Sequence, residues 1–337
     1  MEIYDYICGK GKLSEKHKKE LQEKRGFSEE TIQQFRFFSG GNYLLEYETE
    51  LNKSFTPDAL LAAGVMINSG KSPTFNPQLL EDKVVIPYLN NGLVTLLRPH
   101  KYALKDTGVQ VYPTSWGKNL IITEGEFKAV AAAQLGFSAI ALPGVGSFSG
   151  EHFPELVKLL NDHQVKDICI IFDSEDKVTP GQPRHKANPS QRYDTEYYSY
   201  LMAYLLEREG KTVKIGRLPA SWRVDYKIDI DGALAQGKTA DDIKGVIASA
   251  LSAKDYFNEL DKEAQKIIRK KKDKRYFRSH LSIAHGCYVA TRYRNGEPFP
   301  EEISNFTLSI IAIHDTAEGL IREVVLTHKS GGRSKSL

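Results

Sequence analysis

The stretch of sequence that decides the fold is residues 119–145, which read NLIITEGEFKAVAAAQLGFSAIALPGV. The apolar residues 120–122 predict a short buried strand, and the Ala-rich residues 127–135 predict a helix that ends at Gly136. A second apolar run at 139–142 predicts another strand. Parallel strands need a helical crossover, so a strand, a helix and a strand in this order predict a parallel pair.

The same alternation continues along the chain. Residues 152–161 and 194–209 have the pattern of helices, and residues 168–172 and 212–215 that of strands. A long polar loop at 174–192 separates the third strand from its helix. Repeated strand–helix alternation predicts the α/β class, with a parallel sheet that carries helices on both faces.

Two other patterns precede this sheet. Residues 13–38 predict a pair of short helices, the first capped by Ser14 and the second by Ser28, with a tight corner between them. Residues 83–98 predict a β-hairpin, because Asn90-Asn91-Gly92 lies between two apolar runs and Asn-Gly is a strong hairpin signal.

The sequence after the sheet changes character again. Residues 238–272 predict a charged helical region that ends in a basic run, and residues 303–328 alternate like antiparallel strands. The predicted organisation has four parts: a helical N-terminal subdomain (1–80), a β-hairpin subdomain (81–115), an α/β catalytic domain (116–250), and a basic helical linker with the start of a C-terminal β region (251–337).

Composition narrows the class of protein. The 337 residues are 41% hydrophobic and 26% charged, with a net charge of only +3, so any nucleic-acid contact must come from local basic clusters. Cys8, Cys169 and Cys287 lie far apart, which predicts neither a structural zinc site nor a disulfide framework and suits a reducing cytoplasm. No stretch has the length of a signal peptide or a membrane span, so we expect a cytoplasmic protein without a membrane partner.

Acidic residues follow two of the predicted strands directly. Glu124 ends the first strand before Gly125, and Asp173 and Glu175 follow the third strand two positions apart, on one side of an extended backbone. Carboxylates that converge at strand ends repel one another unless a cation neutralises them, and Mg²⁺ or Mn²⁺ prefers such oxygen ligands. The sequence therefore predicts a metal site for phosphoryl transfer. The alternative is a set of structural acids, such as helix caps.

These residues resemble the TOPRIM pattern of bacterial primases, topoisomerases and related nucleases. That pattern is an apolar strand followed by Glu-Gly, then an apolar strand that ends in Asp-x-Asp, and this chain is similar to it at 120–126 and 168–175. It departs at Glu175, which stands where Asp is usual and is longer by one methylene. The resemblance implies a TOPRIM-like fold in which Glu124, Asp173 and Glu175 are catalytic and hold the metal.

The resemblance extends to DnaG-type primases. Residues 25–35 are similar to their "RG-S-ETI-F" helix pair, and residues 85–88, Gly92 and Arg98 are similar to their "FPI–G–R" hairpin. An N-terminal zinc-binding module, which those primases carry, is missing from this sequence.

A closer resemblance is to the TOPRIM-like domain of plasmid, phage and mobile-element replication proteins. Residues 123–129 match "TEGE-KA", residues 141–145 match "ALPGV", and residues 227–237 match "K-DIDGALA-G". The resemblance covers roughly residues 10–240. It implies a primase core that uses single-stranded DNA and nucleoside triphosphates. A primase-helicase module often follows in such proteins and residues 303–328 resemble its beginning, so a helicase domain or subunit is an implied partner and the chain is expected to be a fragment of a larger protein.

Further residues are candidates for the site. Asp229 is the candidate for an additional metal ligand, whereas Asp231 is expected to cap the helix that begins at Gly232. Substrate phosphates are expected to contact basic residues near the acids, in the hairpin and in the 174–192 loop: Arg98, Lys101, Lys128, Lys177, Arg184 and Lys227. The alternative is that these basic residues are ordinary solvent-exposed side chains.

The predicted function is that of a DNA primase-like nucleotidyltransferase of a mobile-element replication protein, which carries out Mg²⁺-dependent phosphoryl transfer on a single-stranded DNA template. The first alternative is a TOPRIM metal-dependent nuclease that uses the same acids with water as the nucleophile. The second is a non-catalytic nucleic-acid-binding module of a replication complex, in which the acids are structural.

Overall fold

The computed structural model divides the chain into two compact units, Met1–Ala264 and Gln265–Leu337. Side chains are described through residue 271, apart from the gaps in the backbone ranges that follow. The backbone is described for residues 3–70, 73–90, 92–100, 111–148, 152–176, 193–276, 281–284, 287–294, 297–316 and 319–328.

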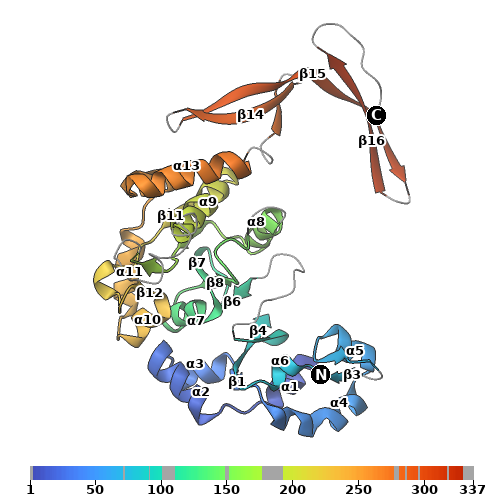
Figure 1. Cartoon of the computed structure of the whole chain (residues 1–337), viewed down its shortest axis with the longest axis vertical. Coiled ribbons are helices and arrows are strands. Elements are labelled where there is room, and N and C mark those ends of the chain that lie inside the picture. The colour runs from blue at the N-terminus through green and yellow to red at the C-terminus, as the bar shows by residue number, and fades with distance from the viewer. Residues whose placement is uncertain are drawn as a thin grey trace. The chain divides into compact units, whose positions relative to one another are not determined.

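A five-stranded sheet organises the first unit, in the order β11-β9-β7-β8-β6 (Figure 1). Its strands are β6 (Tyr112–Pro113), β7 (Asn119–Glu124), β8 (Ala139–Leu142), β9 (Asp167–Ile170) and β11 (Thr212–Ile215). All neighbours are parallel except β6, which pairs antiparallel with β8 at the edge. The predicted parallel sheet is confirmed, and β6 is an additional short strand that the sequence pattern did not indicate.

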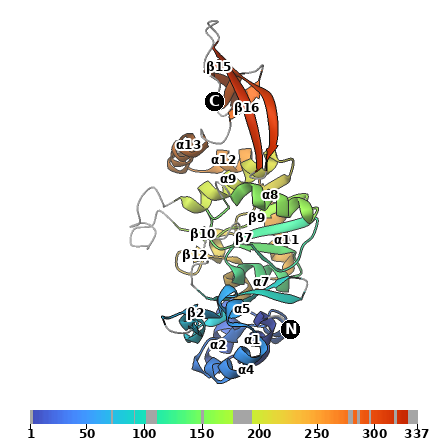
Figure 2. The same ribbon diagram turned by 90° about the vertical axis from the view of Figure 1, so that its right-hand side faces the viewer.

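Helices cover both faces of this sheet, as predicted. Helix α7 (Glu126–Gln134), with α10 (Ile230–Ala235) packed beside it, lies on one face, and α8 (Phe153–Asp162) and α9 (Asp194–Arg208) lie on the other (Figures 1 and 2). The neighbouring strands β7 and β9 are therefore followed by helices on opposite faces. Such a change of direction opens a crevice at the carboxyl ends of the two strands.

The predicted helix pair near the N-terminus is present. Ser14 caps α2 (Glu15–Lys19) by accepting from the His17 amide, and Ser28 caps α3 (Glu29–Gln34) by accepting from the Thr31 amide. Between them lies a π-helical turn at Glu20–Lys24, which the sequence pattern did not predict. The other elements of this region are α1 (Ile3–Lys10), a 3₁₀ turn (Asn42–Tyr47), α4 (Glu48–Ser54), α5 (Pro57–Ala62), α6 (Pro77–Leu80), β2 (Met66–Asn68) and β3 (Pro73–Phe75).

The predicted hairpin is also confirmed. β4 (Val84–Asn90) pairs antiparallel with β5 (Leu93–Pro99), and β1 (Phe38–Ser39) adds a third strand beside β4. Asn91, in the expected turn, lies outside the described residues. The hairpin carries Arg98 towards the start of α7, and this places the end of β5 next to the strand–helix turn after β7.

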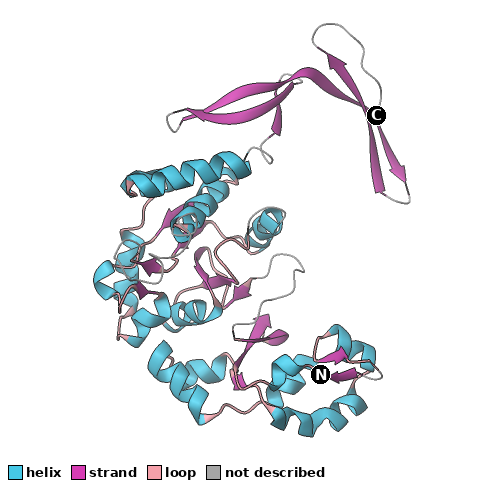
Figure 3. Ribbon diagram, in the orientation of Figure 1, coloured by secondary structure: helices cyan, strands magenta, loops and turns pink. Residues whose placement is uncertain are grey.

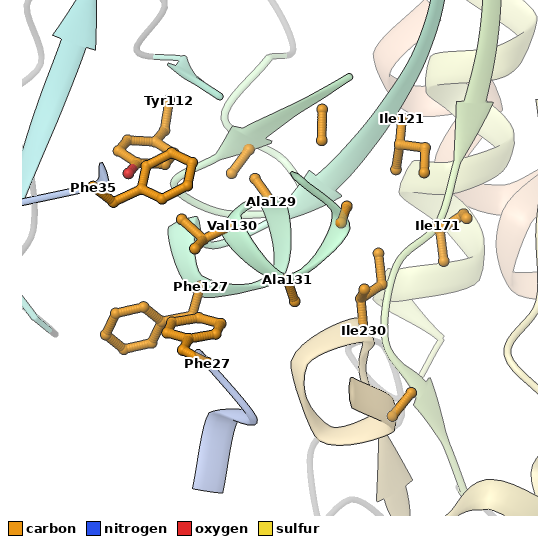
Figure 4. Packing of buried hydrophobic residues seen from close by; sticks show 14 of the residues in the cluster. Phe27, Phe35, Tyr112, Ile121, Phe127, Ala129, Val130, Ala131, Ile171 and Ile230 are labelled. Carbon is orange, nitrogen blue, oxygen red and sulfur yellow. The ribbon is translucent and has the colours of Figure 1, made fainter. Parts of the chain in front are cut away.

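One hydrophobic core joins the helix pair to the α/β sheet. Phe27 contacts Phe127 of α7 edge-to-face with ring centroids 5.9 Å apart, and Phe37 contacts the same ring at 5.7 Å. Figure 4 shows Phe27 against Phe127 on one side of α7, and Ile230 towards Ile171 on the other. Burial of these side chains removes large apolar areas from water, so the helix pair and the sheet are stabilised together.

Helices and a second sheet complete the chain. α11 (Ala240–Ala248), α12 (Ala253–Glu259) and α13 (Lys262–Tyr276) form the predicted charged helical region. The second unit contains most of α13 and a four-stranded antiparallel sheet, drawn with the other strands in magenta in Figure 3, and this sheet confirms the strands expected within 303–328. In the described part of the chain, no helix is long and apolar enough to cross a membrane. The strands of the second unit are β13 (Leu281–Ala284), β14 (Cys287–Arg294), β15 (Glu297–Thr316) and β16 (Gly319–His328).

The corner between the two N-terminal helices supplies a test of this joint core. Gly26 has a φ of +71°, and a Cβ at this position would lie 2.7 Å from the backbone nitrogen of Ala235 in α10. We expect Gly26→Ala to lower the free energy of unfolding by about 3 kcal/mol, because overpacking against backbone adds to the cost of a left-handed conformation. Urea unfolding followed by circular dichroism measures the change.

Gly64→Ala is the matched control. Gly64 has a similar φ of +67°, but a Cβ at this position would meet no heavy atom of the described residues within 4 Å. This variant should lose only about 1–2 kcal/mol, the cost of the backbone conformation itself. Equal losses of unfolding free energy in the two variants would show that the corner at Gly26 does not pack closely against α10.

Candidate functional site

The strand–helix turn after β7 presents the first acid. β7 ends at Glu124, and Gly125 follows with a φ of +81°, a conformation that favours glycine. The Gly125 amide donates to the Leu142 carbonyl of β8 over 2.8 Å, which fixes the turn to the neighbouring strand. Burial, and then the negative charge of Asp173, raise the pKa of the Glu124 carboxyl. Glu124 is therefore half-buried beside other acids, and the charges of Lys128 and Lys227 only partly offset the rise of its pKa.

The second pair of acids follows β9. The Ile171 amide still donates to Ile122 of β7, so the chain runs alongside β7 as far as the acids. Asp173 and Glu175 are both buried, with 9% and 7% of each residue exposed. Asp173 Oδ1 has no hydrogen-bond donor among the described residues. A short ladder then forms from β10 (Ser174–Glu175) and β12 (Lys227–Ile228), with Glu175 opposite Lys227.

Two lysines lie between the acids. The Lys128 Nζ of α7 is 3.4 Å from Asp173 Oδ1 and 3.8 Å from Asp229 Oδ2. The Lys227 Nζ is 2.6 Å from Asp173 Oδ2 and 3.6 Å from Asp229 Oδ2. Burial opposes the charge of Lys128, but the carboxylates, Asp173 first among them, outweigh it and raise the pKa of its ammonium. Both lysines therefore stay charged and bridge the same two carboxylates.

The start of α10 corrects one prediction. Asp231 was expected to cap this helix, but the cap is Asp229, whose Oδ1 accepts from the Gly232 amide over 3.0 Å. Asp231 is instead fully buried, and Arg25 Nη1 lies 2.5 Å from its Oδ2. Burial, together with the charge of Asp229, raises the pKa of Asp231 to about 6. Asp229 was the expected extra acid, and it reaches the lysines with the oxygen that does not cap the helix.

A second buried network holds the start of α7. Glu126 is paired with Arg98 of β5 and accepts from the Tyr88 hydroxyl over 2.5 Å. The Tyr88 and Tyr112 rings meet edge-to-face with centroids 4.8 Å apart. The Arg98 side chain is only 11% exposed. Its guanidinium is thus committed to Glu126, two residues after Glu124, and fixes the turn from inside the protein.

The structure brings together most of the predicted site. Glu124, Asp173 and Glu175 lie at the carboxyl ends of β7 and β9, and Glu175 also acts on the pKa of Glu124. Three of the basic candidates fall outside the described residues: Lys101, Lys177 and Arg184.

Sequence reasoning missed several residues of this region. Arg25 was noted only as part of a helix corner, and its contact with Asp231 has no local sequence signal. Arg223 donates to Ser174 Oγ over 3.0 Å, next to Glu175. It lines a cavity of about 350 Å³ beside Asp173 and Glu175, with Arg217 on the same wall. No sequence signal distinguished these two arginines from surface residues.

The donor set suits a hard cation. Carboxylate oxygens are the ligands that Mg²⁺ prefers. Glu124, Asp173 and Glu175 bring such oxygens to the ends of two neighbouring strands. In the described part of the chain, no group of three or more His, Cys, Asp or Glu side chains stands at metal-binding distances. Ammonium groups contact Asp173 and Asp229.

Comparisons with known proteins agree with this architecture. Residues 114–222 match a family described as a domain of unknown function, DUF3854. A comparison with curated protein sequences finds no match.

The fold is similar to that of DnaG primases. For the RNA polymerase domain of Mycobacterium tuberculosis primase DnaG, the TM-score is 0.53 at 14% identity, over 79% of this chain and 89% of that chain. For a DnaG primase catalytic domain bound to single-stranded DNA, the TM-score is 0.50 at 17% identity, over 77% of this chain and 81% of that chain. The likeness confirms the predicted fold class, an α/β fold with a mostly parallel sheet covered by helices and preceded by a helical and β-hairpin region, and this fold is like that of DnaG catalytic domains.

The buried pair of Arg98 and Glu126 can be tested by a double-mutant cycle. We expect Arg98→Met to lower the free energy of unfolding by about 3–5 kcal/mol, because it leaves the Glu126 carboxylate buried and uncompensated. Arg98→Met combined with Glu126→Gln should recover about 1–3 kcal/mol of this loss. Denaturant unfolding of the single and double variants gives the coupling energy. If the losses of unfolding free energy of Arg98→Met and Glu126→Gln simply add in the double variant, Arg98 does not stabilise the turn after β7 through Glu126.

Proposed function

We propose that this chain is the core of a TOPRIM-type primase, a nucleotidyltransferase that carries out Mg²⁺-dependent phosphoryl transfer on a single-stranded DNA template. The observation that carries the proposal is the convergence of Glu124 and Asp173 from two neighbouring parallel strands whose helices lie on opposite faces. A crevice at that position is where α/β sheets bind ligands. The similarity of the fold to DnaG catalytic domains supports the same function.

The metal in this proposal is Mg²⁺ or Mn²⁺, held by Glu124, Asp173 and Glu175 with Asp229 as a further ligand. When bound, such an ion polarises a phosphate and favours ionisation of a hydroxyl nucleophile. The protein's own contribution is to fix the carboxylates. The Gly125 turn holds Glu124, and the ladder of β10 with β12 holds Glu175. In this proposal Glu124 acts near the reacting hydroxyl, either as a metal ligand or as the acid/base group.

Basic residues would position the nucleotide and the template. The Lys227 side chain is 33% exposed and can meet a phosphate at the acids, whereas Lys128 is directed into them with 15% exposed. Lys101, Lys177 and Arg184 are proposed as template contacts, since lysine and arginine supply the phosphate contacts of nucleic-acid complexes. Arg98 acts in this proposal through Glu126 rather than by touching substrate.

The proposed partners are single-stranded DNA, nucleoside triphosphates and a helicase domain or subunit. A DnaG catalytic domain of similar fold has been seen bound to single-stranded DNA, and this supports the first of them. The origin in a plasmid, phage or other mobile element rests on the resemblance of residues 123–129, 141–145 and 227–237 to replication proteins of such elements.

Two other functions use the same observations. A metal-dependent nuclease would need the same acids with water as the nucleophile. A non-catalytic binding module is favoured by one specific observation, which is that Lys128 and Lys227 already bridge Asp173 and Asp229. In that case the acids would stabilise the fold through ion pairs alone.

Primer synthesis on single-stranded DNA separates these functions. With Mg²⁺ and nucleoside triphosphates, we expect extension products, and we expect Glu124→Gln and Asp173→Asn to reduce them about 100-fold or more, because each change removes a charge at the reacting phosphate. Asp241→Asn is the matched control, since this acid lies on α11 with 87% of its side chain exposed. Circular dichroism confirms that the variants fold.

The other outcomes identify the alternatives. Shortened DNA in place of extension products would assign a nuclease. Binding of single-stranded DNA that survives in Glu124→Gln and Asp173→Asn, with no activity in any variant, would assign a binding module. Calorimetry that detects no Mg²⁺ or Mn²⁺ binding to the wild-type protein would contradict both enzymatic functions.

A further inference from the structure

We propose that Arg223 is a positioning residue that holds the backbone between two of the proposed metal ligands, Asp173 and Glu175. The inference rests on the metal-dependent function proposed above and names a residue on which the metal site depends. Arg223 begins a turn at residues 223–228, which we call the clamp turn. By "acid segment" we mean residues 173–176, which follow β9.

The acid segment lies beyond the end of the main sheet. β9 ends at Ile170, and a further backbone bond from the Ile171 amide to Ile122 joins the chain to β7. The acid segment then pairs with β12 in a separate sheet of two strands. So short a ladder is a weak restraint by itself, because isolated two-stranded pairings are only marginally stable. The positions of Asp173 and Glu175 therefore depend on further contacts with the clamp turn.

The clamp turn has a defined backbone of its own. Val224 and Lys227 exchange both of their backbone hydrogen bonds, over 3.2 and 3.3 Å. Asp225 between them has a φ of +59°, a left-handed conformation that aspartate adopts more readily than most residues. The Asp176 amide donates to the Tyr226 carbonyl over 2.6 Å. The far end of the acid segment is thus tied to the clamp turn through the backbone.

Arg223 supplies a bond at the centre of the acid segment. Its Nε and Nη2 both donate to the Oγ of Ser174, over 3.3 and 3.0 Å. Ser174 is the single residue between the two acids. Hydrogen bonds from charged donors are stronger than those between neutral groups, and the planar guanidinium presents its N–H groups in fixed directions. Arg223 therefore restrains the chain at the residue that sets the separation of the two carboxylates.

The charge of Arg223, taken alone, predicts the opposite effect on a metal. Arg223 and Arg217 line the cavity of about 350 Å³ beside Asp173 and Glu175. Three other acids also line this cavity: Glu196, Glu259 and Asp261. A guanidinium repels a divalent cation, so removal of its charge should leave the metal affinity unchanged or raise it. A loss of metal affinity on removal of Arg223 would instead indicate that the acids have moved.

Arg217 provides the matched control. Its guanidinium carbon is 4.3 Å from the ring centroid of Tyr256, and its Nη2 donates to the Tyr256 carbonyl over 3.4 Å. Its Nη1 lies 3.4 Å from Glu259. Both partners belong to α12. Arg217 therefore brings the same charge to the same cavity, but these contacts hold α12 rather than the acid segment.

Calorimetric titration of the full chain with Mn²⁺ tests the inference. We expect Arg223→Met and Ser174→Ala each to weaken Mn²⁺ binding about 10-fold, the effect typical of losing a residue that orients a metal ligand. Ser174→Ala removes the acceptor and leaves the charge of Arg223 in place. The double variant should bind as either single variant does, because both changes break the same bond. Arg217→Met should bind Mn²⁺ at least as tightly as the wild type.

Primer synthesis at increasing Mn²⁺ concentration gives a readout that a merely structural role would not move. Both variants should need about 10-fold more Mn²⁺ for half-maximal synthesis, in proportion to the weaker binding. Saturating Mn²⁺ should restore a rate close to that of the wild type, because excess metal fills a weakened site. Ser174→Ala removes only one hydroxyl, so it is the variant to use if Arg223→Met does not fold.

The outcomes separate this inference from the proposed function. Wild-type affinity in Arg223→Met and Ser174→Ala would overturn the inference and leave the metal-dependent function standing. Weaker binding in Arg223→Met but not in Ser174→Ala would also overturn it, because the arginine would then not act through Ser174. Equal weakening in Arg217→Met, or a defect that saturating Mn²⁺ does not restore, would overturn it as well. No Mn²⁺ bound to the wild-type protein would overturn the proposed function and the inference with it.

Discussion

The constraint on which this structure depends is the repulsion between carboxylates that are held together at the ends of β7 and β9. Several negative charges in a half-buried crevice are unfavourable unless cations compensate them. The fold supplies these cations from three separate places: Arg25 from the N-terminal helix corner, Lys128 from α7 and Lys227 from β12. The elements around the crevice are therefore connected by charge as well as by apolar packing, and the acids are held by basic residues from different elements.

The N-terminal helix pair belongs to this arrangement rather than merely preceding it. Arg25 contacts Asp231 and also lies over the ring of Phe127, with its guanidinium carbon 5.0 Å from the ring centroid. Gly26 lets the corner approach the backbone of α10 closely. Because α10 begins at the cap residue Asp229, the same contact that docks the helix pair also holds the acid beside the lysines. The β-hairpin has a corresponding role on the other side, where Arg98 holds Glu126. Two buried ion pairs thus connect the N-terminal region to α10 and to the start of α7.

The sheet could be predicted from the sequence because its signals are local. Apolar runs of strand length alternate with helical runs, and the serine caps and the Asn-Gly turn mark where elements begin or reverse. The positions of Glu124 and Asp173 follow from the same logic, since parallel strands end on one edge. Long-range pairing has no such signal. Asp229 and Asp231 are equivalent in sequence terms as helix caps, and only the approach of Arg25, 206 positions away along the chain, decides that Asp231 is buried and Asp229 caps. Arg98 was predicted to contact substrate phosphates, and its pairing with Glu126 was not predicted, because Glu126 lies on another element.

Glu175, which departs from the TOPRIM pattern, lies in a short ladder with Lys227. It stands where the TOPRIM pattern has aspartate, and its extra methylene would extend the carboxylate further from the backbone. The β10–β12 ladder places this longer side chain opposite Lys227 in register, so an acid and an ammonium arrive at the crevice as one unit. The ladder fixes the backbone of Glu175 through hydrogen bonds, which are directional and short. The same ladder brings Lys227 to Asp173, so the element that accommodates the longer acid also supplies compensating charge to its neighbour.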